Sequence, residues 1–420
     1  MSKYLICFCA FLIFFSCSRD YIEVSGDDDS SDLAFTFSTS YVNVDSIDFN
    51  IQYNDMSVNS IQIRKDTAEI PPTVYDGDLV LYDRYFTNTL SDENVTPNIT
   101  YYYSLFYELI DDSNYTFSTS FSYTTLSYFL GMQQMLSELI TYIDNKGRGL
   151  DIILSGETMD LYDDDDDYNI LDAIDGILIS SLNYDDVGSE SPSKDANTLK
   201  IDTFMTTFST IPVFAVDYTT DTNEVVSSRS TFYDNGIVGF NRLIATADIS
   251  DLDSNLPTID SSNTDSVTAL TDVQNLIFLD QPIDDMETQL LTLNYDLIIM
   301  TPFNSYPIAN IANLYSESEI SSLQDKPEGA TSEETRLVYA YLDIGLAIKE
   351  SYYWDDTWVD VDSYPDWIID GYDGSLTDYS IKYWSSDWKT ILYAMIDAIA
   401  DLGYDGIVIG GTHHYQNVSL

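Results

Sequence analysis

The stretch LGYDGIVIGGTHHY, Leu402–Tyr415, carries the pattern that decides the fold. Its apolar run is nearly continuous and then gives way to polar residues, as in a parallel strand that is buried on both faces. A helical pattern, Trp388 to Leu402, precedes it. Runs of the same kind occur earlier in the chain, at 151–157, 176–184, 212–220, 236–245, 275–281, 295–303 and 337–345, and a last one covers 406–414.

Most gaps between these runs are long enough for a helix, and residues 126–143 before the first run also have helical spacing. One helix followed by eight strand-plus-crossover units predicts a (β/α)8 TIM barrel over residues 126–420. Because no helix follows the eighth run, we expect the leading helix to occupy the place of a closing one.

Residues 34–124 follow a different pattern, in which apolar and polar residues alternate between closely spaced turns. Period-two runs of this kind predict an antiparallel all-β sandwich. The block NVTPNITYYYSLFYEL, Asn94–Leu109, resembles fibronectin type III domains. Sugar binding by exposed tyrosines is one interpretation of this part. A spacer that lifts the next domain off a membrane is the favoured one.

The charge balance is very acidic, with 71 Asp and Glu against 16 Lys and Arg and a net charge of -55. Such a chain repels phosphate backbones, so nucleic acid is not expected as a partner. The acids are spread along the chain and mixed with Ser, Thr, Asn and Tyr, which indicates a solvated extracellular surface.

The N-terminus predicts a location. Lys3 precedes an apolar run, Tyr4 to Phe15, that is too short to span a bilayer as a mature helix. The run ends at Ser16-Cys17, which resembles a bacterial lipoprotein cleavage site. We therefore expect a signal peptide over 1–17, lipidation of Cys17, an acidic linker over 18–33, and attachment to a bacterial membrane from outside. A plain secretory signal is the alternative. All three cysteines lie within 1–17, so the remainder forms no disulfide.

Residues 126–420 resemble the barrels of glycoside hydrolase family 114, the endo-α-1,4-polygalactosaminidase-like proteins. One group of matching blocks is Tyr295–Thr301, Tyr339–Trp354, Lys382–Trp388 and Gly403–Tyr415, and the other is Leu126–Glu157, Asp175–Tyr184, Val216–Thr219 and Gly236–Ile244. The second group precedes the first in this chain, which predicts a circularly permuted strand order. A closed barrel tolerates such a change because its spatial neighbours are kept.

Glycoside hydrolysis usually requires two carboxylates that flank the bond. The resemblance implies acids at positions that here hold Ser180, Thr301, Ile348 and Gly410. Glu157 and Asp217 are retained, and Asp343 stands where the family has Ser or Asn. We therefore take Glu157, Asp217 and Asp343 as candidate catalytic residues. A solvated or capping role is the alternative for each of them.

Several other side chains lie at expected strand ends or within the matched blocks. The candidate sugar-binding residues are Tyr184, Tyr218, Asp280, Glu350, Tyr353, Trp354, Tyr383, Trp384 and His413. Flat aromatic faces with polar edges suit sugar rings, and packing in the core is the alternative. His413 and His414, as neighbours on a strand, should point to opposite faces, and five consecutive Asp (163–167) lack the spacing of a calcium loop. No metal or cofactor is expected.

The leading hypothesis is a surface-anchored protein that binds an extracellular polysaccharide, galactosaminan-like by resemblance, with altered or lost hydrolysis. The cationic amines of such a polymer suit an acidic protein. One alternative is an active endo-glycosidase with relocated carboxylates. Another is a non-catalytic adhesion or scaffold protein.

Overall fold

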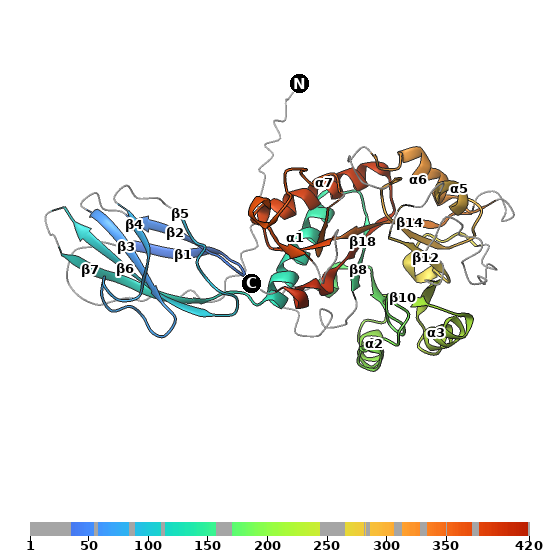
Figure 1. The fold of residues 1–420 in the computed structure, drawn as a ribbon, viewed down its shortest axis with the longest axis horizontal. Coiled ribbons are helices and arrows are strands. Elements are labelled where there is room, and N and C mark those ends of the chain that lie inside the picture. Colours follow the sequence, from blue (N-terminus) through green and yellow to red (C-terminus); the bar gives the residue numbers. More distant parts are fainter. Residues whose placement is uncertain are drawn as a thin grey trace, which may run out of the picture.

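The computed structural model describes residues 35–53, 58–83, 89–110, 114–156, 170–243, 265–280, 282, 286–305, 313–327, 334–349, 351–371 and 378–418. They form an antiparallel sandwich and a nearly closed barrel of parallel strands (Figure 1). The predicted lipoprotein signal, Cys17 and the predicted acidic linker lie outside these residues. None of the described helices is both long and apolar enough to cross a membrane.

The sandwich has the fibronectin type III-like arrangement of a three-stranded and a four-stranded sheet, ordered β1-β2-β5 and β4-β3-β6-β7. Its strands are β1 (Phe35–Val42), β2 (Ile47–Tyr53), β3 (Val58–Asp66), β4 (Asp78–Asp83), β5 (Thr89–Asp92), β6 (Thr100–Leu109) and β7 (Tyr115–Thr124). The predicted alternation places Phe49, Ile61 and Tyr103 in a common core between the sheets. The prediction of an all-β sandwich is confirmed.

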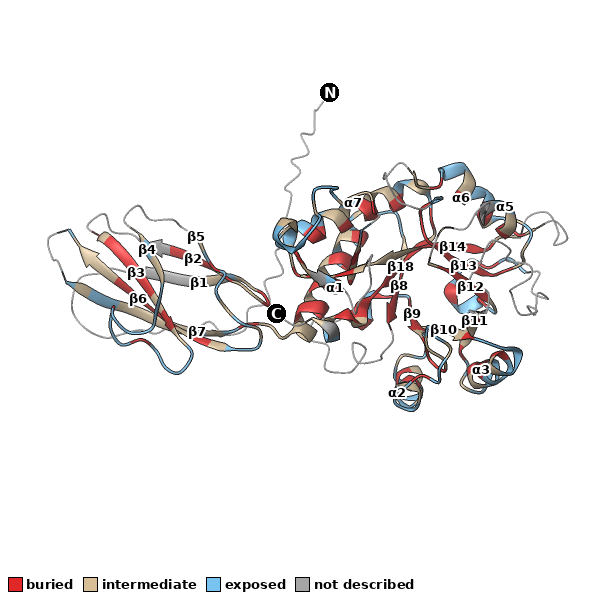
Figure 2. Ribbon diagram, viewed as in Figure 1, coloured by how far each residue is buried: buried red, intermediate tan, exposed pale blue. Residues whose placement is uncertain are grey.

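The barrel sheet of the described residues has eight strands in the order β11-β10-β9-β8-β18-β14-β13-β12, and every ladder in it is parallel. The strands are β8 (Asp151–Gly156), β9 (Gly176–Ser180), β10 (Val213–Thr219), β11 (Val238–Leu243), β12 (Leu276–Leu279), β13 (Leu297–Met300), β14 (Leu337–Asp343) and β18 (Gly406–Gly410). Each of the eight predicted apolar runs contains one of these strands. The strands other than β11 are buried along most of their length (Figure 2).

The seam of the barrel lies between β11 and β12, which are in contact but are not joined by a hydrogen-bonded ladder. An ion pair bridges this seam, because Arg242 Nη1 of β11 lies 2.7 Å from Oδ1 of Asp280, which directly follows β12. The barrel is therefore nearly closed, and side chains complete its circle at this point.

Helices cover the outside of the barrel: α1 (Tyr128–Asn145), α2 (Lys194–Thr207), α3 (Thr222–Asp234), α5 (Met286–Leu290), α6 (Glu317–Gln324) and α7 (Ser386–Leu402), with the 3-10 turns η2 (Ile170–Ala173), η3 (Leu270–Asp272), η5 (Val361–Ser363) and η6 (Thr412–Asn417). The leading helix α1 packs between α7 and η6 (Figure 1). Tyr142 of α1 stacks on Tyr393 of α7 with ring centroids 4.0 Å apart, and Phe129 contacts Tyr415 of η6.

Several strand predictions extend too far; the run at 176–184, for example, ends as a strand at Ser180. The run at 406–414 forms a strand only as far as Gly410, because Gly411 turns the chain at φ +73° and residues from Thr412 form η6. The run at 337–345 ends as a strand at Asp343. A small antiparallel sheet between β14 and α7, formed by β15 (Leu346–Ile348), β17 (Asp378–Ile381) and β16 (Ile368–Gly371), was not predicted.

The sandwich is joined to the barrel through the turn between β1 and β2. Val44 in this turn is fully buried and belongs to the barrel core, where it faces Gly131 of α1. Asn43 accepts the N–H of Leu126 at 3.1 Å. Beside this turn, Glu138 of α1 accepts hydrogen bonds from Tyr41 at 2.9 Å and from Lys389 of α7 at 2.6 Å. The two parts therefore share packed and hydrogen-bonded contacts as well as the connecting chain.

Candidate sugar site at the barrel mouth

The carboxyl ends of the parallel strands meet at one end of the barrel, where functional side chains of such barrels gather. We call this end the mouth, and define it by Tyr218, Arg242, Asp280, Tyr341, Asp343 and His413. Their electrostatic effects on one another agree with this placement. Asp343, Asp280 and Tyr218 all raise the pKa of the Tyr341 phenol, and Asp343 raises the pKa of His413 against the effect of burial.

Asp343 is a carboxylate at the mouth that the backbone holds in place. Its Oδ1 accepts the N–H groups of Gly345 at 2.8 Å and Leu346 at 3.2 Å, and its Oδ2 accepts the Tyr341 hydroxyl at 3.4 Å. Burial raises the pKa of Asp343 above its ordinary value, while these hydrogen bonds and His413 oppose the rise. Asp343 is thus a fixed acceptor with one oxygen bound by the backbone.

Asp280 is already paired. Its partner Arg242 also lies over the ring of Tyr218, with the guanidinium carbon 6.0 Å from the ring centroid. The two side chains of the ion pair are 18% and 28% exposed. Asp280 therefore contributes to the mouth as part of a nearly neutral Arg–Asp pair beside an aromatic face.

Asp217 faces away from the mouth. It is completely buried, and it accepts the Asn183 N–H at 2.8 Å, the Asn183 side-chain amide at 2.7 Å and the Ser228 hydroxyl of α3 at 2.5 Å. Burial raises the pKa of Asp217, and these hydrogen bonds oppose the rise. Side chains alternate along a strand, so the neighbouring Tyr218 points to the mouth while Asp217 points to α3. Asp217 fixes the loop after β9 to α3.

The remaining predicted acids, Glu157 and Glu350, lie outside the described residues. The structure therefore places one of the three candidate catalytic residues, Asp343, at the mouth. Within the described part of the chain, no group of three or more His, Cys, Asp and Glu side chains could hold a metal ion.

The two histidines lie in η6, and not on opposite faces of a strand as the sequence pattern predicted. Their ring centroids are 4.3 Å apart. Burial lowers the pKa of each to about 4, and Asp343 partly opposes this change at His413. His413 is therefore neutral at neutral pH and can donate or accept a hydrogen bond at the mouth.

The predicted aromatic residues fall into two groups. Tyr383 and Trp384 are buried at 0% and 3% exposure, and the Tyr383 hydroxyl donates to the Tyr128 carbonyl of α1 at 2.5 Å. They pack the core, so they offer no face to a ligand. The other predicted aromatics are partly exposed, namely Tyr184, Tyr218, Tyr353 and Trp354.

Tyr353 and Trp354 belong to an aromatic cluster beside the small sheet. The Tyr353 hydroxyl accepts the Ile348 N–H at 2.9 Å, and its ring packs edge-on against Trp388 at 5.5 Å between centroids. Trp354 lies 5.4 Å from Trp358. Because Ile348 shares the short strand β15 with Leu346, whose N–H bonds to Asp343, this cluster borders the mouth.

Arg242 and Tyr341 are mouth residues that sequence analysis missed. Tyr341 lies two residues before Asp343 in the run LVYAYLD, and this spacing puts both on one face of a strand. That spacing could have predicted that Tyr341 lies beside Asp343. Arg242 gave no comparable signal, because its pairing with Asp280 depends on the closure of the barrel.

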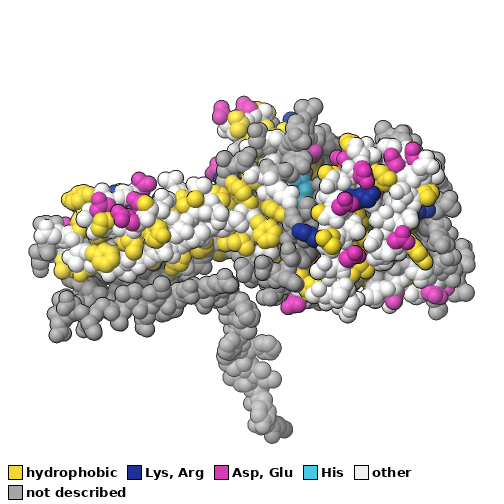
Figure 3. Space-filling view, turned by 90° about the horizontal axis from the view of Figure 1, so that it is seen from below, with side chains coloured by type: hydrophobic (Ala, Val, Ile, Leu, Met, Phe, Trp, Pro, Cys, Tyr) yellow, Lys and Arg dark blue, Asp and Glu magenta, His cyan; other side chains and the backbone are white. Residues whose placement is uncertain are grey.

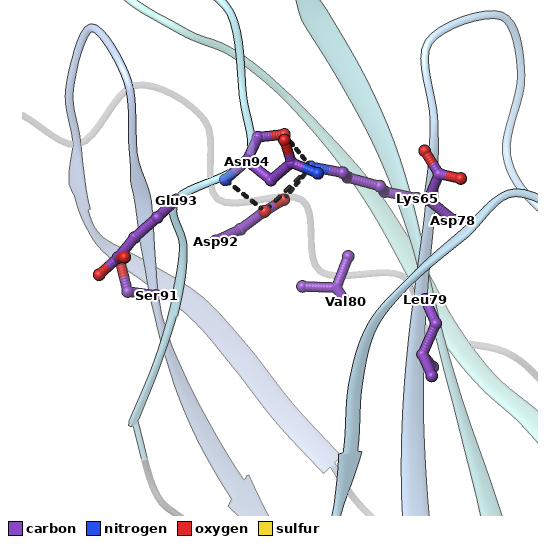
Figure 4. A pocket seen from close by; sticks show the side chains of 8 residues that line it. All are labelled: Lys65, Asp78, Leu79, Val80, Ser91, Asp92, Glu93 and Asn94. Atoms are coloured by element: carbon purple, nitrogen blue, oxygen red, sulfur yellow. Dashed lines mark hydrogen bonds and ion pairs between the residues drawn. The ribbon is translucent and has the colours of Figure 1, made fainter. Parts of the chain in front are cut away.

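A separate pocket of about 300 Å³ opens in the sandwich between the edge strands β4 and β5 (Figure 4). Its floor is the buried ion pair of Lys65 and Asp92, whose atoms are 2.9 Å apart. Lys65 also donates to the Asn94 carbonyl, and Asp92 accepts the Tyr103 hydroxyl at 2.8 Å. These groups satisfy one another's charges and hydrogen bonds. We therefore interpret them as residues that stabilise the sandwich.

No family model matches the chain. It is 30% identical over 102 residues to the uncharacterized protein MJ1477 of Methanocaldococcus jannaschii, a match that covers 24% of this chain and 27% of that protein. It is 31% identical over 70 residues to an uncharacterized protein of Thermotoga maritima, covering 17% and 21%. The matched part thus spans about a quarter of the length of these curated relatives.

Among solved structures, the fibronectin type III domain of human contactin 1 is 15% identical, with 25% of this chain and 87% of that chain covered and a TM-score of 0.19. The β-glucuronidase of Lactobacillus rhamnosus is 10% identical, with 90% and 60% covered and a TM-score of 0.27. At TM-scores this low, neither likeness assigns a function.

Proposed function

We propose that this protein binds an extracellular polysaccharide at the mouth of a diverged glycoside-hydrolase-like barrel. The observation that carries the proposal is how the predicted carboxylates Asp343, Asp280 and Asp217 are paired and oriented. Asp343 is a fixed carboxylate at the mouth, Asp280 is paired with Arg242, and Asp217 is turned toward α3. Within the described residues, the mouth thus offers one acid without a cationic partner, Asp343, at the same end of the barrel as the Tyr218 ring. This suits the recognition of a sugar better than the two-carboxylate chemistry of hydrolysis.

The ligand class that we propose is an α-1,4-linked polymer containing galactosamine, as the resemblance to family 114 implies. A protonated amine would pair with the Asp343 carboxylate, and a sugar ring would lie against the partly exposed Tyr218, beside the Arg242 guanidinium that lies over its ring. The acidic surface supports this choice, since Asp and Glu are dispersed over the visible face of the barrel in Figure 3 and would attract a cationic polymer.

The barrel is proposed to be a circularly permuted (β/α)8 barrel. Its support is the position of α1, which precedes β8 in sequence but packs against α7, which precedes β18, and against η2, which follows β8. A helix that followed β18 would lie at this place. We also propose that lipidation at Cys17 anchors the protein to the outside of a bacterial membrane, with the sandwich as a spacer.

The second candidate is an active endo-glycosidase in which Asp343 acts with Glu157. The backbone donors on Asp343 favour it, because catalysis requires a rigidly oriented carboxylate. A non-catalytic adhesion protein with an unused mouth is the third alternative.

A galactosamine oligosaccharide and its N-acetylated counterpart distinguish these candidates when they are added to the full chain. We expect calorimetry to show binding of the cationic oligosaccharide, weaker binding of the acetylated one, and no release of reducing ends. Release of reducing ends would replace the binding proposal with the hydrolase. Absence of binding to both sugars would contradict the proposal and leave the adhesion protein.

A further inference from the structure

Gly410 ends β18 and Gly411 directly follows it, and the side-chain space of both glycines is already filled. A Cβ built on Gly410 would lie 2.2 Å from the hydroxyl oxygen of Tyr341, and one built on Gly411 would lie 2.4 Å from Oδ1 of Asp343. Both approaches are far closer than van der Waals contact. Because Asp343 and Gly410 are register partners on the adjacent strands β14 and β18, side chains from β14 occupy the space of both strands here.

Tyr341 reaches this space from inside the barrel. Its ring packs edge-on against Phe278 of β12, with centroids 5.1 Å apart. Burial and the nearby Asp343 and Asp280 raise the pKa of the Tyr341 phenol well above its ordinary value, so the hydroxyl keeps its proton and acts as a donor. That donor is directed at Oδ2 of Asp343, the oxygen that the backbone leaves unoccupied.

We infer that Tyr341 is a positioning residue for Asp343, and that Gly410 is required at the end of β18 because the Tyr341 hydroxyl occupies its side-chain space. Two N–H groups hold Oδ1, and the phenol lies 3.4 Å from Oδ2, the oxygen at which we place the ligand. Tyr341 thereby sets where a bound amine or hydroxyl meets the carboxylate. The inference rests on the proposed function only for the identity of that ligand.

Other titratable groups also face this pair. They are His413 from η6, Tyr353 from the segment after β15, Asp280 after β12 and Tyr218 of β10. His413 is neutral near neutral pH, and Asp280 is held by Arg242. As the pH falls from neutral, protonation therefore reaches both Asp343, whose pKa is raised by burial, and His413, whose pKa is lowered to about 4.

The steric part is tested without a ligand by thermal unfolding of Gly410→Ala, Tyr341→Ala and the double variant. We expect Gly410→Ala to lower the melting temperature in the native background and to have at most half that effect in the Tyr341→Ala background. Equal effects in the two backgrounds would overturn the inference, because Gly410 would then be needed for another reason.

The positioning part is tested by affinity for the galactosamine oligosaccharide as the pH is lowered from neutral. Tyr341→Phe removes a hydrogen bond that stabilises the charged carboxylate, so the pKa of Asp343 should rise. We expect affinity to fall about tenfold and to be lost at a higher pH than in the native chain. The matched control is Tyr339→Phe, which removes a phenol of the same strand that bonds to Asp151 at 2.6 Å. It should leave the pH profile unchanged.

An unchanged affinity and pH profile in Tyr341→Phe would contradict the positioning role. If the native chain binds no oligosaccharide, the proposed function fails, while the melting temperatures of the Gly410 and Tyr341 variants still decide how Tyr341 uses the space at position 410.

Discussion

Replacing Lys326 with Met is expected to lower the free energy of unfolding by about 3–5 kcal/mol. Lys326 and Asp296 form an ion pair of 2.7 Å in which both side chains are completely buried. Lys326 also donates to the Asp265 carbonyl at 2.7 Å, and Asp296 accepts the Gln274 N–H at 2.9 Å. Removing the cation would leave a buried carboxylate without its neutralising charge at the amino ends of β12, β13 and β14.

Urea unfolding followed by circular dichroism measures this loss. The matched control is Lys194→Met, because Lys194 pairs with Glu190 at 3.0 Å in a setting where the two side chains are 27% and 72% exposed. That variant should change the free energy of unfolding by less than about 1 kcal/mol. Similar losses in the two variants would show that the buried pair has no special role.

Replacing Val44 with Asp is expected to have a comparable effect, about 3–5 kcal/mol, because it places an unpaired charge in the barrel core. Val44 is fully buried although it comes from the sandwich, and a Cβ on Gly131 would lie only 2.4 Å from its side chain. We expect the variant to separate the two parts, so that one unfolding transition becomes two and protease cleaves near the junction.

Calorimetry measures the number of unfolding transitions, and limited proteolysis detects cleavage near the junction. Val226→Asp on α3 is the control, since Val226 is 64% exposed and its change adds the same charge. It should unfold as the native chain does. A Val44→Asp chain that kept a single transition at the native temperature would contradict the idea that this turn joins the two parts.

Much of this fold was predictable because parallel strands buried on both faces have nearly continuous apolar runs. The run NLIFLDQ contains β12, and YDLIIMTPF contains β13. Strand ends were less predictable. The end of β18 depends on the left-handed conformation of Gly411, which the pattern of apolar residues does not predict. The small sheet after β14 has strands of only three or four residues, too short for a recognisable period.

The candidate site was partly predictable for a related reason. Asp343 ends a strand, and strand ends of such barrels meet at one mouth. Asp217 lies near a strand end too, but its face is set by alternation within β10, which turns it to α3. The roles of Arg242 and Gly410 depend on which side chains a neighbouring strand presents, so they required the three-dimensional structure.

The central claim is that Asp343 binds a cationic sugar at the mouth, and calorimetric titration of a galactosamine oligosaccharide into Asp343→Asn tests it most directly. The control is Asp151→Asn, a carboxylate of β8 that also accepts a tyrosine hydroxyl of β14. We predict that Asp343→Asn weakens affinity about tenfold or more and that Asp151→Asn leaves it unchanged. Native affinity in Asp343→Asn would contradict the account.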